Sequence, residues 1–181
     1  MSDREDQVLV SRTLAGDRNA FGGLVDKYQK AVFNLALRMV QDRDDAEDIA
    51  QHTFVKAFSR LSSFNQSFRF FSWLYRIALN ECANCLNRRK RHEPLSETLA
   101  SDEGREAAEI ESDEQRFLQE ALADLQEGDR ALVLLKHYEG RSYEEIGEIL
   151  GISAQKVKSR LFSARLKLRE ILLRKGVRAN A

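Results

Sequence analysis

The apolar residues of this chain recur at steps of three and four residues, and this spacing restricts the possible fold more than any other feature. The longest such run is Phe21, Leu24, Val25, Tyr28, Val32, Leu35, Ala36 and Met39. This spacing lines up apolar side chains on one face of an α-helix, whereas a half-buried strand would need strict alternation. One Pro and nine Gly are also few turn formers for a β protein. We therefore predict an all-α fold.

Several sequence signals predict where the helices begin and end. Asp17 or Asn19 is suited to cap the helix that contains Phe21. The same apolar spacing predicts further helices over about residues 44–61, 72–91, 118–125, 128–138, 142–150 and 154–174.

Charge divides the chain into three parts. Residues 1–92 hold 15 Lys and Arg against 11 Asp and Glu, residues 93–127 hold 2 against 12, and residues 128–181 hold 12 against 6. The net charges are thus +4, −10 and +6 in a chain that is neutral overall. The acidic stretch has few large apolar residues, which predicts a flexible linker over 93–114 between helical domains at 1–92 and 115–181. Two basic ends indicate two surfaces that face polyanions, although an acidic linker can also be merely solvated.

Composition argues against several classes of protein. No apolar run approaches 18 residues, so we expect no membrane span or secretion signal. Cys82 and Cys85 are the only cysteines, which excludes a disulfide framework and fits a reducing cytoplasm. Both lie within a helical pattern without a second Cys pair, so we interpret them as buried thiols rather than zinc ligands.

An enzyme interpretation would place a metal at the acidic cluster Asp42, Asp44, Asp45, Glu47 and Asp48. The cluster lacks the Gly and the closing Glu of a calcium loop, and the three His residues are scattered. Acidic residues early in a helix also favour the helix dipole without any further role. We therefore predict no catalytic residues, no metal and no cofactor.

A helix-turn-helix motif is predicted in the second domain. Ser142 and Glu145 form a capping-box pattern, and Gly151 is suited to the left-handed conformation that ends a short helix. Ser153 then caps a long final helix that is basic opposite its apolar face. The candidate base and phosphate contacts on this helix are Gln155, Lys158, Ser159 and Phe162, with Arg160, Arg165 and Arg169 nearby. An ordinary charged surface helix is the alternative.

The first domain has a different polar surface. A loop over residues 62–71 contains four Phe, and the helix after it carries a stripe without acids: Arg76, Asn80, Asn84, Asn87, Arg88 and Arg91. Asn is a mediocre helix former, so three on one face need another explanation. Aromatic rings beside amides and Arg are suited to hold single-stranded DNA, because rings stack on unpaired bases. Rings that simply pack beneath the loop are the alternative.

Motifs from both domains together resemble the extracytoplasmic-function (ECF) sigma factors of bacterial RNA polymerase. The similarity covers about residues 8–92 and 115–175, in the order and spacing of the family. It is carried by DAEDIAQ at 45–51, FSWLYRIALN at 71–80, YEEI at 143–146, LGIS at 150–153 and VKSRL at 157–161.

The resemblance implies an alternative sigma factor that binds core RNA polymerase, melts the minus-10 promoter element and reads the minus-35 element. The implied core-polymerase contacts are Asp45, Glu47, Asp48 and Gln51. The minus-10 contacts are Phe64, Arg76, Asn80, Asn84, Arg88, Arg89 and Arg91. The minus-35 contacts are Gln155, Lys158, Ser159, Arg160, Phe162, Ser163 and Arg165.

The family also implies partners and a setting. The expected partners are core polymerase, promoter DNA and an anti-sigma factor that clamps both domains. The chain would be a cytoplasmic monomer when free, without membrane contact, and would serve a stress or envelope regulon. The linker would thread toward the active site and RNA exit of the polymerase.

Three positions depart from the family pattern: His52 and Asn84 stand where acids are frequent, and Ser163 where Arg or His is frequent. These departures affect the strength of core binding and the promoter sequence that is read. A dimeric helix-turn-helix regulator of duplex DNA is the second hypothesis. It explains the C-terminal half but not the Asn/Arg stripe beside the Phe-rich loop.

Overall fold

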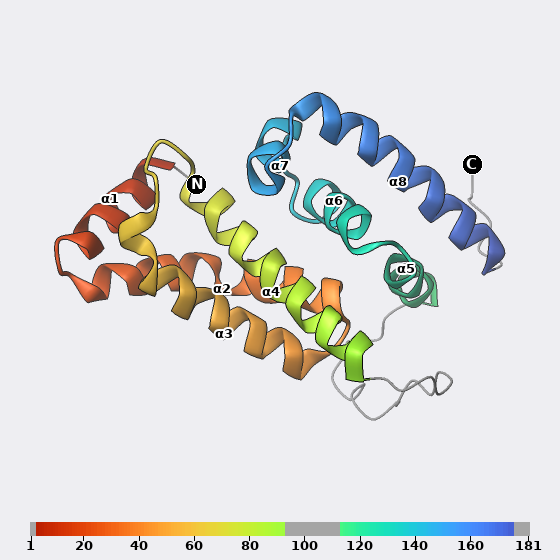
Figure 1. Cartoon of the computed structure of the whole chain (residues 1–181), viewed down its shortest axis with the longest axis horizontal. Coiled ribbons are helices and arrows are strands. Elements are labelled where there is room, and N and C mark those ends of the chain that lie inside the picture. Colours follow the sequence, from red (N-terminus) through yellow and green to blue (C-terminus); the bar gives the residue numbers. More distant parts are fainter. Residues whose placement is uncertain (1–2, 93–112, 176–181) are drawn as a thin grey trace.

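The computed structural model describes residues 3–92 and 113–175, and every regular element within these ranges is a helix, as predicted. The N-terminal domain occupies the left and centre of Figure 1. It comprises α1 (Asp3–Leu14), α2 (Arg18–Val40), α3 (Arg43–Ser59), the short 3-10 helix η1 (Leu61–Ser63) and α4 (Phe70–His92).

The core of the N-terminal domain lies between α2, α3 and α4, which all pack on one another, while α1 covers α2. Leu24, Val32 and Leu74 are fully buried there. Each buried Leu stabilises the fold by about 1.5–3 kcal/mol relative to an exposed one. Because these residues follow the predicted helical spacing, their burial confirms the amphipathic pattern.

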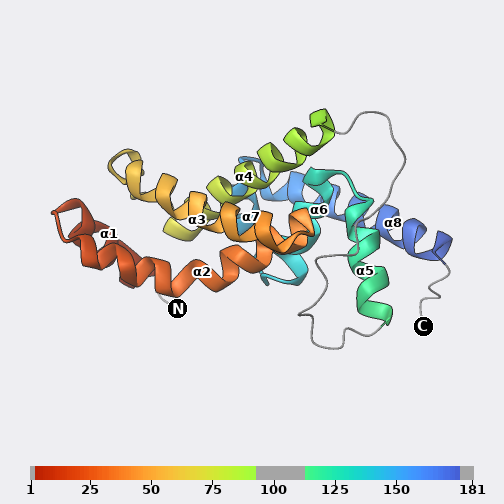
Figure 2. The same cartoon turned by 90° about the horizontal axis from the view of Figure 1, so that it is seen from below.

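The C-terminal domain is smaller and is organised around its last helix. It comprises α5 (Asp113–Ala123), α6 (Glu127–His137), α7 (Tyr143–Leu150) and α8 (Ala154–Arg174). The long α8 packs against α5, α6 and α7 in turn, and in Figure 2 it runs behind α6 toward the C-terminus. Val157, Leu161 and Ala164 line its buried face, while most of its other side chains are exposed.

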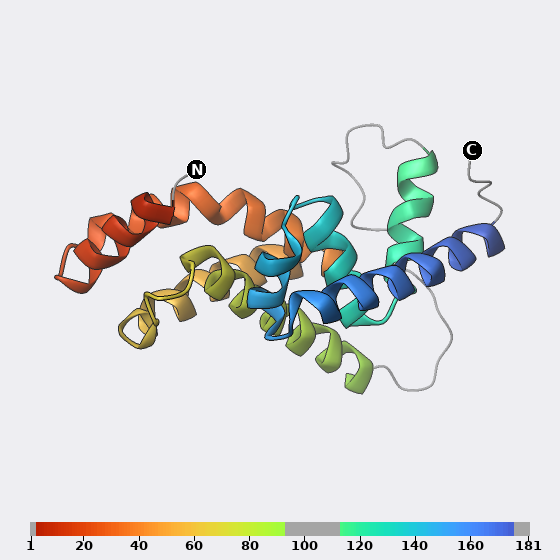
Figure 3. The same ribbon diagram turned by 90° about the horizontal axis from the view of Figure 1, so that it is seen from above.

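The two domains are packed against each other. α7 lies beside the first half of α4, and α6 contacts α2, as Figures 1 and 3 agree. The buried apolar residues of both domains belong to one continuous hydrophobic cluster. The spacing of apolar residues within single helices did not predict this packing.

Side-chain caps set the helix starts. Asp17, one of two predicted candidates, caps α2 by accepting hydrogen bonds from the backbone N–H groups of Asn19 and Ala20 at 3.1 and 3.3 Å. Asp42 caps α3 through the N–H of Asp45 at 2.9 Å. Helix α3 therefore begins at Arg43, one residue before the predicted start near Asp44, and Asp45 lies in its first turn.

Helix α1 was not predicted, because its buried face is partly polar. Asp6 is only 2% exposed and accepts a hydrogen bond from the Tyr28 hydroxyl at 2.5 Å and another from Lys27. Burial, and then Asp6, raises the pKa of Tyr28 above its ordinary value. A buried charged pair between two helices leaves no trace in apolar periodicity.

The second helical segment begins earlier than predicted. α5 starts at Asp113, so the last two residues of the predicted linker (93–114) belong to a helix. The remaining linker residues, 93–112, lie outside the described residues.

Candidate nucleic-acid interface

The polar stripe of α4 lies on the outside of the N-terminal domain. Asn80, Asn84, Asn87, Arg88 and Arg91 are exposed, as predicted. The one acid in this helix, Glu81, lies elsewhere and pairs with Lys56 of α3 at 2.6 Å. The stripe is therefore free of negative charge and presents amides that can hydrogen-bond to base edges and cations that can pair with phosphates.

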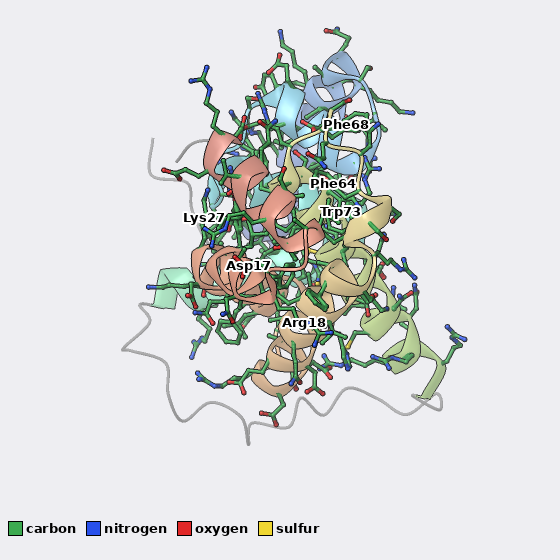
Figure 4. The ribbon with its side chains drawn as sticks, turned by 90° about the vertical axis from the view of Figure 1, so that its left-hand side faces the viewer. Asp17, Arg18, Lys27, Phe64, Phe68 and Trp73 are labelled. Carbon is green, nitrogen blue, oxygen red and sulfur yellow. The ribbon has the colours of Figure 1, made fainter. Side chains whose placement is uncertain are left out.

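The Phe-rich loop before α4 separates its rings into buried and exposed ones. Phe64 is 8% exposed and packs on Trp73 and Phe70, with ring centroids 5.0 and 5.9 Å away. Phe68 is 55% exposed at the loop tip, and Figure 4 shows it separate from the Phe64–Trp73 pair. Aromatic packing of this kind stabilises the loop by about 0.5–1.5 kcal/mol per pair. The family resemblance implied Phe64 as the ring that contacts the minus-10 strand, whereas in this structure Phe64 is buried and Phe68 is the exposed ring of the loop.

A cavity of about 230 Å³ opens beside these rings. Its wall includes Phe64 and Phe68 from the loop and Asp3, Gln7 and Val10 from α1. Helix α1, which was not predicted, therefore supplies one side of a partly apolar pocket beside the Phe-rich loop.

Two residues that were assigned to different partners are joined in the structure. Arg89 forms ion pairs with Asp42 at 3.2 Å and with Asp45, and it donates to the carbonyl of Val40 at 3.0 Å. Burial tends to raise the pKa of Asp45, but the hydrogen bond from Cys85 and the charge of Arg89 outweigh it, so the pKa is lowered. The ion pair of Asp45 and Arg89 thus links α3 to α4.

The predicted core-polymerase face lies on the exposed side of α3. Glu47, Asp48 and Gln51 are exposed, and Glu47 pairs with Arg43, one turn earlier, at 3.1 Å. The same face continues into Val55 and Phe58, which are 61% and 43% exposed. Neither residue was assigned to this surface from the sequence.

The helix-turn-helix forms as predicted. Ser142 and Glu145 make both hydrogen bonds of a capping box, and Gly151 ends α7 in the left-handed conformation with φ of 67°. Ser153 caps α8 by accepting from the N–H of Lys156 at 3.2 Å. A Cβ added at Gly147 would lie 2.6 Å from the carbonyl oxygen of Ile152, so this turn needs Gly there. The two helices are therefore held in a fixed relation.

The exposed face of α8 carries most of the predicted minus-35 residues. Gln155, Lys158, Ser159 and Ser163 are exposed, and Phe162 is 65% exposed. A helix with such a face fits a major groove, where polar tips meet base edges and a ring meets a thymine methyl.

Two of the predicted arginines on α8 contact α6 instead of pointing freely outward. Arg160 pairs with Asp129 at 3.3 Å, and Lys167 pairs with the same carboxylate at 2.7 Å. Arg165 donates to Nε2 of His137 at 3.2 Å. Burial and then the charge of Arg165 lower the pKa of His137. These contacts fix the angle of α8 on the domain.

Arg76 occupies a different place from the rest of the α4 stripe. Its Nε donates to the carbonyl oxygen of Ile149 at 3.0 Å, and its Nη2 donates to that of Glu148. Both carbonyls belong to the last turn of α7 in the other domain. The structure thus brings Arg76 into contact with the C-terminal domain, while the residue itself stays exposed.

The two cysteines are buried, as predicted. Cys82 is 0% and Cys85 3% exposed, and burial is the main cause that raises the pKa of both thiols, that of Cys82 to about 12. Among the described residues, no group of three or more His, Cys, Asp or Glu side chains is placed to hold a metal ion. Within the same residues, no helix has the length and apolar content needed to cross a membrane.

Comparison with known families gives a match in each domain. The family described as Sigma-70 region 2 matches residues 24–92, and Sigma-70 region 4 matches residues 117–168. The first match contains the polar stripe of α4, and the second contains the helix-turn-helix.

Relatives match over nearly the whole chain. The RNA polymerase sigma-H factor of Pseudomonas aeruginosa is 38% identical over 178 residues, which cover 91% of this chain and 92% of that protein. The ECF RNA polymerase sigma-E factor of Escherichia coli K12 is 38% identical over 173 residues, with coverage of 88% and 90%.

Two solved structures superpose on both domains together. CnrH, in complex with the cytosolic domain of CnrY, has a TM-score of 0.72 and 28% identity, covering 93% of this chain and 97% of its own. The sigma factor RpoE of Bartonella quintana, in complex with the anti-sigma factor NepR, has a TM-score of 0.68 and 27% identity, with coverage of 84% and 96%.

Proposed function

Since this chain belongs to the ECF sigma factors of the sigma-70 family, which recognise promoters when transcription begins, we propose that its two polar helix faces read two separate promoter elements. The resemblance found in the sequence motifs is thereby confirmed. In the proposal, α4 and the loop before it take the minus-10 strand, and α8 takes the minus-35 duplex.

The exposed face of α8 carries the proposal, because it follows a structurally complete helix-turn-helix. Lys158 and Ser159 lie beside the 65% exposed ring of Phe162 on a helix whose opposite side is locked into the core. Exposure of a Phe ring to water is unfavourable. In a major groove the ring can instead pack on a thymine methyl or a sugar. Lys158, Gln155 and Ser163 then contact phosphates or base edges.

The minus-10 strand is assigned to the outer surface of α4. Asn80 and Asn84 offer amides to unpaired bases, and Arg88 and Arg91 neutralise phosphates. Phe64 holds the loop from beneath through Trp73, so Phe68 is the ring that can stack on a base without any rearrangement.

Core polymerase is assigned to α3. Glu47, Asp48 and Gln51 supply a polar, acidic half of the surface, and Val55 with Phe58 supplies an apolar half. Mixed surfaces of this kind suit protein partners, since the apolar part stabilises the complex and the charges orient it.

The regulation and the cellular location of the chain are inferred from the family. The CnrH and RpoE structures each hold a protein partner, which in the case of RpoE is an anti-sigma factor. By analogy, an anti-sigma factor holds this chain inactive until a stress or envelope signal releases it to transcribe its regulon. The chain acts in the cytoplasm as a monomer until it joins polymerase, and it catalyses no reaction of its own.

The test is in vitro transcription with bacterial core polymerase and a promoter library, in which the start sites are sequenced. Asn80→Ala should alter preference at the minus-10 element, and Lys158→Ala at the minus-35 element. Lys30→Ala is the matched control, because Lys30 is exposed on α2, away from both faces. A chain that redirects no initiation but shifts duplex DNA alone would instead be a dimeric regulator.

A further inference from the structure

We propose that Arg89, which the family resemblance assigns to the minus-10 strand, is instead a positioning residue for the polymerase-binding face of α3. The proposal rests on the assignment of core polymerase to α3, and it adds the side chain that fixes the direction of that face. The contacts around one guanidinium group and one neighbouring thiol support it.

The first contact of Arg89 is with the turn between α2 and α3. This turn consists of Gln41, in the left-handed conformation with φ of 55°, and Asp42, which caps α3. Nη1 of Arg89 donates to the carbonyl oxygen of Val40, the last residue of α2, at 3.0 Å. Carbonyls in the last turn of a helix have no partner within the helix and carry partial negative charge, so a cation is favoured there.

The other terminal nitrogen of Arg89 contacts two carboxylates at the start of α3. Nη2 lies 3.2 Å from Oδ2 of Asp42, and it also pairs with Asp45. Asp42 meanwhile accepts the backbone N–H of Asp45 through Oδ1 at 2.9 Å. Arg89 therefore holds the end of α2, the cap of α3 and its first turn at the same time. A planar guanidinium has enough fixed donors for this arrangement, whereas the ammonium of Lys is a point charge.

A second residue of α4 approaches the same carboxylate. The thiol of Cys85, one turn before Arg89, donates to Oδ2 of Asp45 at 3.0 Å. Burial alone would raise the pKa of Asp45, but the hydrogen bond from Cys85 and the charge of Arg89 lower it. Asp45 is thus an ionised group that faces α4, while Glu47 and Asp48 are exposed.

These contacts lie at the end of α3 that carries the exposed acids. Glu47 and Asp48 are within one turn of Asp45, so the direction of this turn determines where their carboxylates point. Helix α4 is held independently, because Leu74 and Cys82 along it are buried in the core. Loss of Arg89 should therefore displace the acids of α3 more than the polar stripe of α4.

The test measures two affinities with the full chain. One is the affinity of the chain for core polymerase without promoter. The other is the affinity of the assembled holoenzyme for a single-stranded minus-10 oligonucleotide, taken from a promoter that the library experiment selects. Arg89→Lys keeps the positive charge but loses the planar fork. It should weaken binding to core polymerase about threefold to tenfold, because displaced acids lose charged contacts. The affinity for the oligonucleotide should not change.

Arg18→Lys is the matched control, since it makes the same substitution at an exposed position at the start of α2 and should change neither affinity. Arg89→Ala separates the two roles, because a side chain that neutralised a phosphate would be needed for oligonucleotide binding. We expect Arg89→Ala to weaken binding to core polymerase and to leave oligonucleotide binding unchanged. Unchanged binding of Arg89→Lys to core polymerase, or weaker oligonucleotide binding by Arg89→Ala, would overturn the proposal.

A second measurement needs no polymerase. Cys85 is 3% exposed and lies against Asp45, so its rate of reaction with a maleimide reports whether α3 stays against α4. Arg89→Lys should raise this rate about threefold to tenfold, as peptide mass spectrometry would show, because local opening becomes more frequent. Cys82 is 0% exposed and should react no faster than in the wild type.

Equal acceleration at both cysteines, or at neither, would mean that Arg89 does not position α3. Because this second measurement involves neither polymerase nor promoter, its failure is distinguishable from failure of the proposed function, in which the wild-type chain itself would not bind core polymerase.

Discussion

The helices α4 and α8 both present a polar face that is poor in acids, but contacts within the chain occupy the two faces to different extents. On α4, Arg76 and Lys90 are engaged by the C-terminal domain. On α8, Lys158 and Phe162 remain exposed, and the helix is held from its sides through Asp129 and His137. Two surfaces of similar composition can thus differ in availability, because availability depends on what the rest of the chain offers as a partner.

The largest loss of stability is expected when the side chain that anchors α8 in the core is removed. Leu161 is 1% exposed beneath the recognition face, and Leu161→Ala should destabilise the protein by about 2–5 kcal/mol through lost burial and a cavity. Urea denaturation followed by circular dichroism measures the loss. Leu166→Ala, at a position 45% exposed on the same helix, is the control and should change stability by less than about 0.5 kcal/mol. Equal losses would mean that α8 is not anchored as described.

A smaller effect is expected on the occupied side, at Tyr75. Tyr75→Phe keeps the ring but removes the hydrogen bond to the Glu139 carboxylate, and should cost about 1.5–3 kcal/mol. Burial and then Glu139 raise the pKa of Tyr75 above its ordinary value of 10.0. The unfolded chain therefore ionises first, so the stability from Tyr75 is present below about pH 10 and is lost above it.

The measurement is urea denaturation of both proteins at pH 8 and at pH 10.5. The wild type should lose more stability between these values than Tyr75→Phe does. Identical losses would show that the Tyr75 hydroxyl is not buried against Glu139 in solution.

The smallest expected effect is a change in the pKa of His137, which tests the contact between α8 and α6. Burial, then Arg165 and Lys136, lower the pKa of His137 below its ordinary value of 6.5. Arg165→Ala should raise that pKa, as NMR titration of the His137 ring would report. The stability from neutral His137 is present above about pH 6.5 and is lost as pH falls through the lowered pKa. An unchanged pKa in the variant would mean that Arg165 points into solvent.

Local sequence patterns were sufficient to predict most of the helices, although not α1 or the start of α5. Ser142, Glu145 and Gly151 determine the limits of α7 because a capping box and a left-handed end involve only residues within one turn. The outward placement of Asn80 and Phe162 likewise follows from helical periodicity alone. The family resemblance rests on the same short motifs.

Only the tertiary structure decided which polar and aromatic groups are available. Phe64 is buried and Phe68 exposed because Trp73 and Phe70 receive one ring and not the other. Arg76 meets residues more than 70 positions later in the chain. Periodicity reports which side of a helix faces the core, but it carries no information about which distant segment packs there. The sequence by itself therefore determined the amphipathic helices and the recognition motifs, while long-range packing determined the place of α1 and which side chains are free to bind.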